Sequence, residues 1–274
     1  MKTLLLFFTL LLIPVYATYI KADYDVSFGV IGKIGKAEIS YIQEKDNYTI
    51  IVHAWTTGMS ALISQNRQES YFSQGKIIGE TLRPDVFVKF KQSDNYTKSS
   101  VYLFDHDKKK VLSHFAKEDY GTKNYFDVDS MQNIRVPHTE FSTKEEDFRF
   151  YTKDDLLSLF FNTKKILPSL KEGDQKQLSA IGSKTPNCII DIEVPAGENR
   201  SYLQEVMADN EGRLLTIILH QDIFQSKEGR LHVIFDEEGL ATNVLLKDVI
   251  LFGDIRGERT YLEKQRGSIS ANIH

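Results

Sequence analysis

Apolar and polar residues alternate with a period of two along most of this chain, and that pattern constrains its fold most strongly. From Asp23 to Gly29, for example, Tyr24, Val26 and Phe28 alternate with charged or small residues. Successive side chains of a β-strand point to opposite faces, so such a segment predicts a strand with one buried face.

Similar segments follow one another, separated by turn residues such as Lys45-Asp46-Asn47, Gln74-Gly75-Lys76 and Asp105 to Lys108. Consecutive strands joined by short turns pair antiparallel, so the sequence predicts a mainly β, antiparallel meander. The predicted strands are 23–29, 36–43, 48–57, 67–72, 77–82, 86–91, 99–104, 111–115, 188–194, 201–208, 213–220, 230–235 and 241–252.

One principal helix is predicted, from Thr152 to Leu167. Thr152 is the expected N-cap, Asp155 completes a capping-box pattern three residues later, and Pro168 ends the helix. The apolar residues that fall on one stripe of this helix are Leu156, Leu159, Phe160 and Leu167.

Two regions have no clear pattern. Residues 116–150 are polar and poor in aliphatic side chains, so we expect an irregular surface excursion or a soft boundary between two lobes. The last residues, 260–274, are expected to form a flexible tail. The predicted domain therefore covers residues 18–259.

The first seventeen residues are typical of an export signal. Lys2 precedes an apolar run from Leu4 to Ile13, which as a helix would reach only about half of a hydrocarbon core roughly 30 Å thick. We expect cleavage after Ala17. Because Thr18 rather than a cysteine would then begin the chain, the protein is predicted to be periplasmic, without a lipid anchor or membrane span.

The cysteine count and the net charge further limit the cellular compartment and the class of binding partner. Cys188 is the single cysteine, so no internal disulfide can form, which favours a bacterial periplasm over eukaryotic secretion. Three N-x-S/T sequons are the main argument against this choice. The net charge of −4 gives no indication of the basic surface that nucleic-acid binding requires.

No motif with a catalytic mechanism is present, so we expect no enzyme, no cofactor and no metal site. Asp105-His106-Asp107 is better explained as a solvated hairpin tip than as a metal site. Cys188 lies among isoleucines, where a thiolate is disfavoured. Carboxylates that could still converge into an unrecognised site include Glu69, Glu80 and Glu205.

Several short segments occur in an order and spacing that resemble a bacterial exported family catalogued as domain of unknown function 3108. They are Tyr24 to Gly29 with Lys33 to Ala37, Asp154 to Leu159, and Ile234 to Gly239. The resemblance implies an exported, mainly β protein whose long curved antiparallel sheet, half-barrel-like, packs on one principal α-helix. It implies no activity.

A long curved sheet either fills its interior or holds a guest, and the sequence does not choose between these outcomes. We hypothesise a non-catalytic periplasmic protein that binds a lipid or other hydrophobic ligand in a groove lined by Trp55, Phe72, Phe87 and Phe160. The alternative is a cell-envelope interaction or scaffold module that binds a partner protein through a sheet edge or through residues 116–150.

Overall fold

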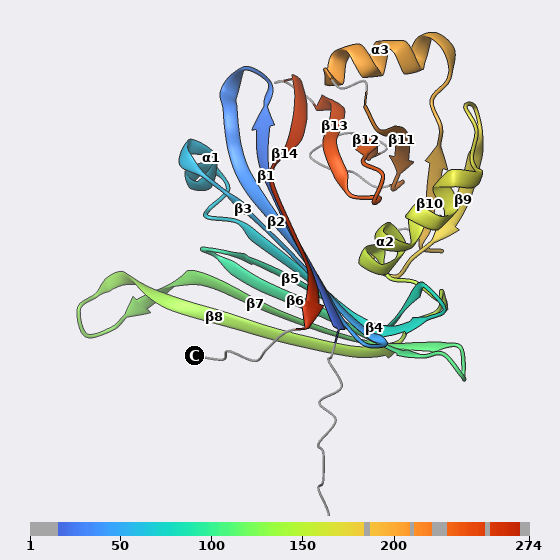
Figure 1. The fold of residues 1–274 in the computed structure, drawn as a ribbon. Helices are drawn as coiled ribbons and strands as arrows, with labels where there is room; N and C mark the ends of the chain where they lie inside the picture. Colours follow the sequence, from blue (N-terminus) through green and yellow to red (C-terminus); the bar gives the residue numbers. More distant parts are fainter. Residues whose placement is uncertain (1–15, 184–186, 209–210, 221–228, 250–252, 269–274) are drawn as a thin grey trace, which may run out of the picture.

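The computed structural model describes residues 16–183, 187–208, 211–220, 229–249 and 253–268 (Figure 1). The predicted signal peptide therefore lies outside the described residues, except for Tyr16 and Ala17. Among the described residues, no helix is long and apolar enough to cross a membrane.

In these described residues, fourteen antiparallel strands form one continuous sheet in the order β8-β7-β6-β5-β4-β3-β2-β1-β14-β13-β12-β11-β10-β9. The strands are β1 (Tyr16–Phe28), β2 (Gly32–Glu44), β3 (Asn47–Thr56), β4 (Gln68–Ile78), β5 (Thr81–Ser93), β6 (Tyr96–Asp105), β7 (Lys110–Asp127), β8 (Gln132–Asp147), β9 (Gln175–Ser179), β10 (Ile189–Glu193), β11 (Arg213–Ile218), β12 (Arg230–Phe235), β13 (Ala241–Val249) and β14 (Gly253–Ser268). The helices are α1 (Gly58–Ile63), α2 (Leu156–Ile166) and α3 (Gly197–Met207), with short 3-10 turns η1 (Gly29–Ile31) and η2 (Leu167–Ser169).

The sheet consists of two meanders joined by one long-range pairing. Strands β1 to β8 follow each other in sequence order, as do β9 to β14, and the meanders meet where β1 pairs with β14. That pairing extends from Tyr16 opposite Ser268 to Phe28 opposite Ile255. The predicted fold class, a mainly β protein with a curved antiparallel sheet, is confirmed.

The sheet curls around α2, whereas α3 covers the opposite face of the second meander (Figure 1). Neighbouring residues of β11 show the two faces. Leu215 belongs to the core cluster against which Phe160 of α2 packs, while Leu214 packs with Leu203 and Met207 of α3. This division follows from the period-two geometry of a strand.

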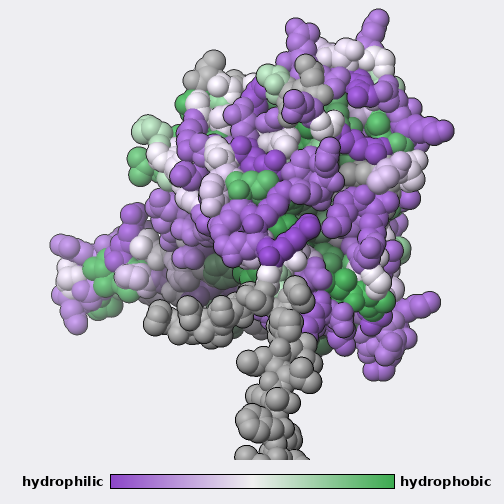
Figure 2. Space-filling view, in the orientation of Figure 1, coloured by the Kyte–Doolittle hydropathy of each residue, from purple (hydrophilic) through white to green (hydrophobic). Residues whose placement is uncertain are grey.

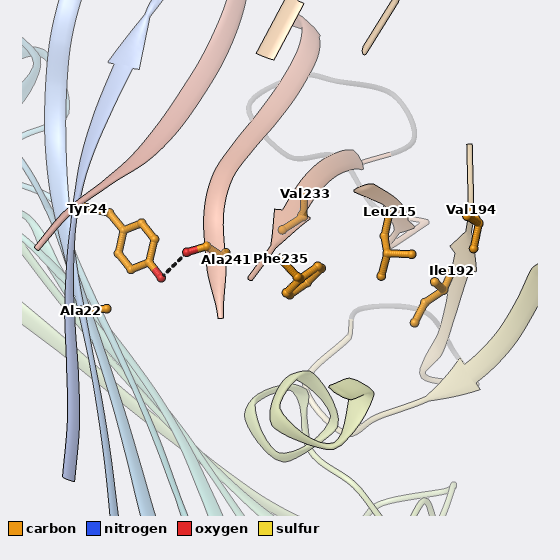
Figure 3. Close-up of a cluster of buried hydrophobic side chains, with 8 residues drawn as sticks. All are labelled: Ala22, Tyr24, Ile192, Val194, Leu215, Val233, Phe235 and Ala241. Atoms are coloured by element: carbon orange, nitrogen blue, oxygen red, sulfur yellow. Dashed lines mark hydrogen bonds between the residues drawn. The ribbon is translucent and has the colours of Figure 1, made fainter. Parts of the chain in front are cut away.

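The largest core cluster joins β1 to the second meander (Figure 3). The ring of Tyr24 reaches across it, and its hydroxyl donates a 2.9 Å hydrogen bond to the carbonyl oxygen of Ala241. Burial raises the pKa of the Tyr24 phenol to about 12, so it remains a donor at physiological pH. The other members are Ala22, Ile192, Val194, Leu215, Val233 and Phe235.

Most predicted strands are confirmed, but the turn predicted at Gln74-Gly75-Lys76 is wrong. Strand β4 continues to Ile78, and the turn lies between β4 and β5, where Gly79 has a positive φ of 57°. Gly75 instead marks a bulge at which the β4–β5 register shifts. A glycine within a strand signals either a turn or a bulge, and the local sequence does not distinguish the two.

Three other expectations are corrected. Residues 116–150 are not an irregular excursion, because 110–147 form the long hairpin β7–β8. Residues 260–268 are not a flexible tail, because they pair with β1 as part of β14. The strand predicted at 201–208 lies mostly in α3, whose Leu203 and Met207 are buried at helical spacing.

We predict that Gly75→Ala destabilises the protein strongly, by about 3 kcal/mol, because overpacking forces backbone shifts. A Cβ atom at this position would lie 2.1 Å from the carbonyl oxygen of Arg83, which is part of the backbone of β5. Gly121→Ala is the matched control, since that strand glycine has open space around it. Equal unfolding free energies of the two variants in urea would contradict the role given to Gly75.

Candidate functional site

The start of α2 is fixed by Asp155, not by Thr152 as the sequence suggested. The Oδ1 atom of Asp155 accepts hydrogen bonds from the backbone N–H groups of Leu157, at 2.7 Å, and Ser158, at 3.0 Å. Ser158 Oγ in turn accepts from the Asp155 N–H at 2.9 Å. This reciprocal cap uses a serine where a capping box usually has Glu or Gln. The Thr152 hydroxyl instead donates to the Asp154 carbonyl oxygen at 2.6 Å.

The same carboxylate ties α2 to the sheet. Ser73 of β4 donates from Oγ to Asp155 Oδ2 at 2.6 Å, and the Tyr48 hydroxyl of β3 lies 3.1 Å from Ser73 Oγ. All three side chains are buried. Desolvation raises the pKa of Asp155 to about 6, against the opposing effect of its hydrogen bonds.

Asn162, two turns further along α2, binds the first residues of β5. Its Oδ1 accepts from the Leu82 N–H at 2.8 Å, and its Nδ2 donates to the Leu82 carbonyl oxygen at 2.9 Å. Nδ2 also donates to Asp154 Oδ1 at 2.9 Å. Desolvation by burial raises the pKa of Asp154. The Asn162 amide thereby makes both backbone hydrogen bonds that a neighbouring strand would make to Leu82.

Two clefts flank this contact, and Asn162 and Lys165 line both of them. The first, which we call the Tyr41 cleft, has a volume of about 460 Å³. Tyr41 and Phe161 form one wall, with stacked rings whose centroids are 5.1 Å apart. The other apolar residues that line it are Ile20, Ile77, Leu82 and Leu240, and its polar lining includes Gln43, Glu80, Lys164 and Glu238.

The second, which we call the β9 cleft, has a volume of about 490 Å³ and lies between α2 and the last strand of the sheet. Its apolar lining comes from Phe150, Leu159, Leu178 and Ile189. The polar residues that line it are Thr81, Lys153, Asp154, Asn162, Lys165, Gln177, Ser179 and Asn187.

The four aromatic residues predicted to line one groove do not share a surface. Phe87 is fully buried in the core with Tyr102. Phe160 packs between two core clusters, with its ring centroid 5.4 Å from that of Phe235. Both therefore face the interior, but as packed core, and neither lines the two clefts.

Trp55 and Phe72 lie on the opposite, outer face of the sheet. In β4, Ser73 is buried against Asp155, so the adjacent Phe72 must point the other way. Phe72 pairs with Ile51 of β3, which places Ile51 and then Trp55 on that face. There Trp55 stacks on His53, with ring centroids 5.0 Å apart. A shared groove for all four residues is therefore wrong.

Exposed apolar side chains gather at two places that the sequence analysis did not single out. One is the distal part of the β7–β8 hairpin, which we call the arm tip, where Phe126 is 57%, Val128 72% and Met131 70% exposed. The other is α1, with Met59, Leu62 and Ile63. Figure 2 shows apolar side chains at both places.

The carboxylates suggested as a hidden site do not converge. Glu69 pairs with Arg67 and Lys91, and the hydrogen bonds and positive charges around it lower its pKa. Glu80 is exposed in the β4–β5 turn, whereas Glu205 belongs to α3 on the other face. Within the described part of the chain, no group of three or more His, Cys, Asp or Glu residues is placed to hold a metal ion.

The model of a family described as "Protein of unknown function (DUF3108)" matches residues 23–178. One similar solved structure is a β-barrel-like protein of domain of unknown function DUF1849 from Brucella abortus. It is 8% identical, with a TM-score of 0.31, and the alignment covers 92% of this chain and 98% of that chain. No curated protein shows significant similarity to this sequence.

Asp155 should make stability fall as the pH rises from about 4 to about 7. Its folded pKa of about 6 exceeds an ordinary unfolded value of about 3.9, so the folded state keeps the proton longer. The contribution is complete below the unfolded pKa and is lost as the pH passes the folded pKa. At 1.36 kcal/mol per pKa unit it amounts to about 3 kcal/mol.

Urea unfolding of wild type and Asp155→Asn between these pH values tests this. The amide keeps an oxygen that can accept from the helix N–H groups but carries no titrating charge, so the variant should lack the decrease. Asp46→Asn, in an exposed turn, is the control and should follow wild type. Parallel pH profiles for wild type and Asp155→Asn would show that the carboxyl is not held protonated.

Proposed function

Because this chain belongs to the family described as "Protein of unknown function (DUF3108)", a description that assigns no activity, we propose its function from the geometry. We propose that it is a non-catalytic periplasmic protein that holds a lipid or other hydrophobic molecule in the Tyr41 cleft. The observation that carries this proposal is the cleft itself, a cavity of about 460 Å³ with an apolar wall and a polar rim at the surface of a filled core.

The lining supports an apolar guest. Ligand sites in proteins typically measure about 300–1,000 Å³ and combine apolar walls with a few polar groups that orient the ligand. Here Leu82, Phe161 and Leu240 come from three different parts of the chain and are buried from the opposite side by the core. A guest would therefore contact an apolar wall that is packed against the core.

The rim supports a guest with an anionic end. Lys164 and Lys165, at the end of α2, lie beside the opening, and Lys165 is 3.1 Å from the carboxylate of Glu80. That carboxylate is 91% exposed, so the ion pair is screened by water and contributes little. A fatty acid carboxylate or a phosphate headgroup could replace Glu80 as the partner of Lys165.

The periplasmic location is part of the proposal and is compatible with the position of β1. Cleavage after Ala17 would remove only the first two described residues of this strand. Thr18 would remain opposite Gln43 of β2 and Arg266 of β14. The new amino terminus would therefore begin within the sheet.

Filling the Tyr41 cleft should weaken binding of an apolar probe. Ile77→Trp places a larger side chain in the lining of the cleft, and we expect roughly tenfold weaker binding of N-phenyl-1-naphthylamine and of a dansylated fatty acid. Ile78→Trp is the matched control, because Ile78 is the next residue, is 49% exposed and does not line the cleft. Fluorescence titration measures both affinities.

Circular dichroism and thermal unfolding should show that both variants keep the fold. Equal probe affinity in wild type and in folded Ile77→Trp, or no saturable binding to wild type, would contradict the proposal. Native mass spectrometry of protein extracted gently from cells would identify the natural ligand of the cleft. That ligand should be absent from the Ile77→Trp variant.

The arm tip supports a second candidate, a cell-envelope interaction module that binds a partner protein. Three apolar side chains more than half exposed at the end of a projecting hairpin are unusual for a surface without a partner. Asp127 and Asp129 lie between them in sequence, so the tip favours a protein surface over an anionic membrane.

Site-specific photo-crosslinking in cells distinguishes this candidate. A photoreactive phenylalanine at Phe126 should give a discrete crosslinked partner, whereas the same group at Tyr202, a 48% exposed residue of α3, should not. Identical crosslinking patterns from the two positions would contradict an interface at the arm tip.

A further inference from the structure

The last strand of the sheet, β9, has one side open for hydrogen bonding. Ala180 N donates to the Cys188 carbonyl oxygen at 2.9 Å, and Val194 N donates to the Asp174 carbonyl oxygen at 2.9 Å. These two pairs set the phase of the β9–β10 ladder, so the even-numbered residues face β10. The backbone groups of Gln175, Gln177 and Ser179 therefore point away from the sheet.

The chain itself continues this ladder for one residue and then leaves it. Ile181 is the next outward-facing residue, and its N–H donates to the Asp154 carbonyl oxygen at 2.9 Å. Its own carbonyl oxygen accepts from the Leu156 N–H at 3.1 Å, which forms a parallel bridge with Asp155. At Leu156 the chain turns into α2. The short segment from Asp154 to Leu156 therefore stops pairing with the edge where the β9 cleft begins.

The other edge of the sheet is protected. Phe148 N donates to the Val111 carbonyl oxygen at 2.7 Å, so the even-numbered residues of β8 face β7 and Pro137 faces outward. A proline there offers no N–H group, and charged side chains are frequent along β8. The outward-facing residues Gln177 and Ser179 of β9, by contrast, keep their N–H groups and line the cleft beside α2.

We propose that an extended peptide segment with alternating apolar and acidic residues binds in the β9 cleft as an additional strand on β9. In such recognition the main-chain hydrogen bonds supply affinity and the pockets for alternate side chains supply specificity. Leu159 and Leu178 provide the apolar lining for one set of side chains.

The charged side chains at the cleft discriminate between acidic and basic guests. Lys153 and Lys165 line it, and the exposed Lys176 belongs to β9 itself. Asp154 also lines the cleft, but it is buried and its carboxylate accepts a hydrogen bond from Asn162. Acidic guests are therefore favoured over basic ones. This inference goes beyond the proposed apolar ligand and does not rest on it.

Fluorescence anisotropy with the full mature chain tests the proposal. The probe is a fluorescein-labelled peptide of about seven alternating valine and glutamate residues, a typical strand length. Gln177→Pro removes an outward N–H group without breaking the β9–β10 ladder, and we expect roughly tenfold weaker binding. Gln177→Ala removes the same side chain but keeps that N–H group, so it should bind more tightly than Gln177→Pro, and the difference measures the backbone contribution.

Amide hydrogen exchange of the wild-type protein provides an independent measurement if Gln177→Pro does not fold. The N–H groups of Gln177 and Ser179 should exchange fast in the free protein and slowly with peptide, while that of Leu178 should be slow in both. Unchanged exchange at Gln177 and Ser179, or equal binding of a valine–lysine peptide, would overturn the proposal. Binding of N-phenyl-1-naphthylamine should survive in folded Gln177→Pro, which separates this site from the Tyr41 cleft.

Discussion

The buried hydrogen bonds between Asp155, Ser73 and Tyr48 hold the interior of this protein in place. A buried carboxyl is costly unless its oxygens are bonded, and here two helix N–H groups and a serine hydroxyl satisfy them. Because these donors come from α2 and β4, the carboxyl is satisfied only when the helix is seated against the sheet. The network therefore favours one position of α2 over others of similar apolar contact.

The seated helix then connects the two meanders. Phe160 packs against the cluster of the second meander and against the one that contains Tyr41 and Leu82. Both clefts arise at the end of this contact, because Asn162 bonds to the backbone of β5 there and Lys165 lies beside it. Because Asn162 and Lys165 of α2 line both clefts, α2 positions both proposed sites.

Much of the fold could be predicted from the sequence because its signals are local. Alternation located most strands, and the apolar stripe located α2, although Asp155 rather than Thr152 caps it. The errors occurred where contacts with residues distant in sequence determine the secondary structure. β14 exists because β1 is its partner more than two hundred positions away, and α3 is a helix because Leu203 and Met207 pack on β11 to β13. Residues 116–147 of the β7–β8 hairpin include no buried residue, so this part of the hairpin carries no alternating apolar signal.

The candidate sites depend on a distinction that alternation cannot make. Period two assigns Phe72 and Ser73 to opposite faces, but it does not say which face is concave, and the aromatic residue was chosen over the serine for the interior. The structure reverses that choice because Ser73 bonds to Asp155. The β9 edge was equally invisible in sequence, since its open backbone groups are defined by the phase of the β10 ladder and by where Leu156 leaves it. Recognition sites made of backbone groups and cleft walls have no motif, and only the three-dimensional arrangement reveals them.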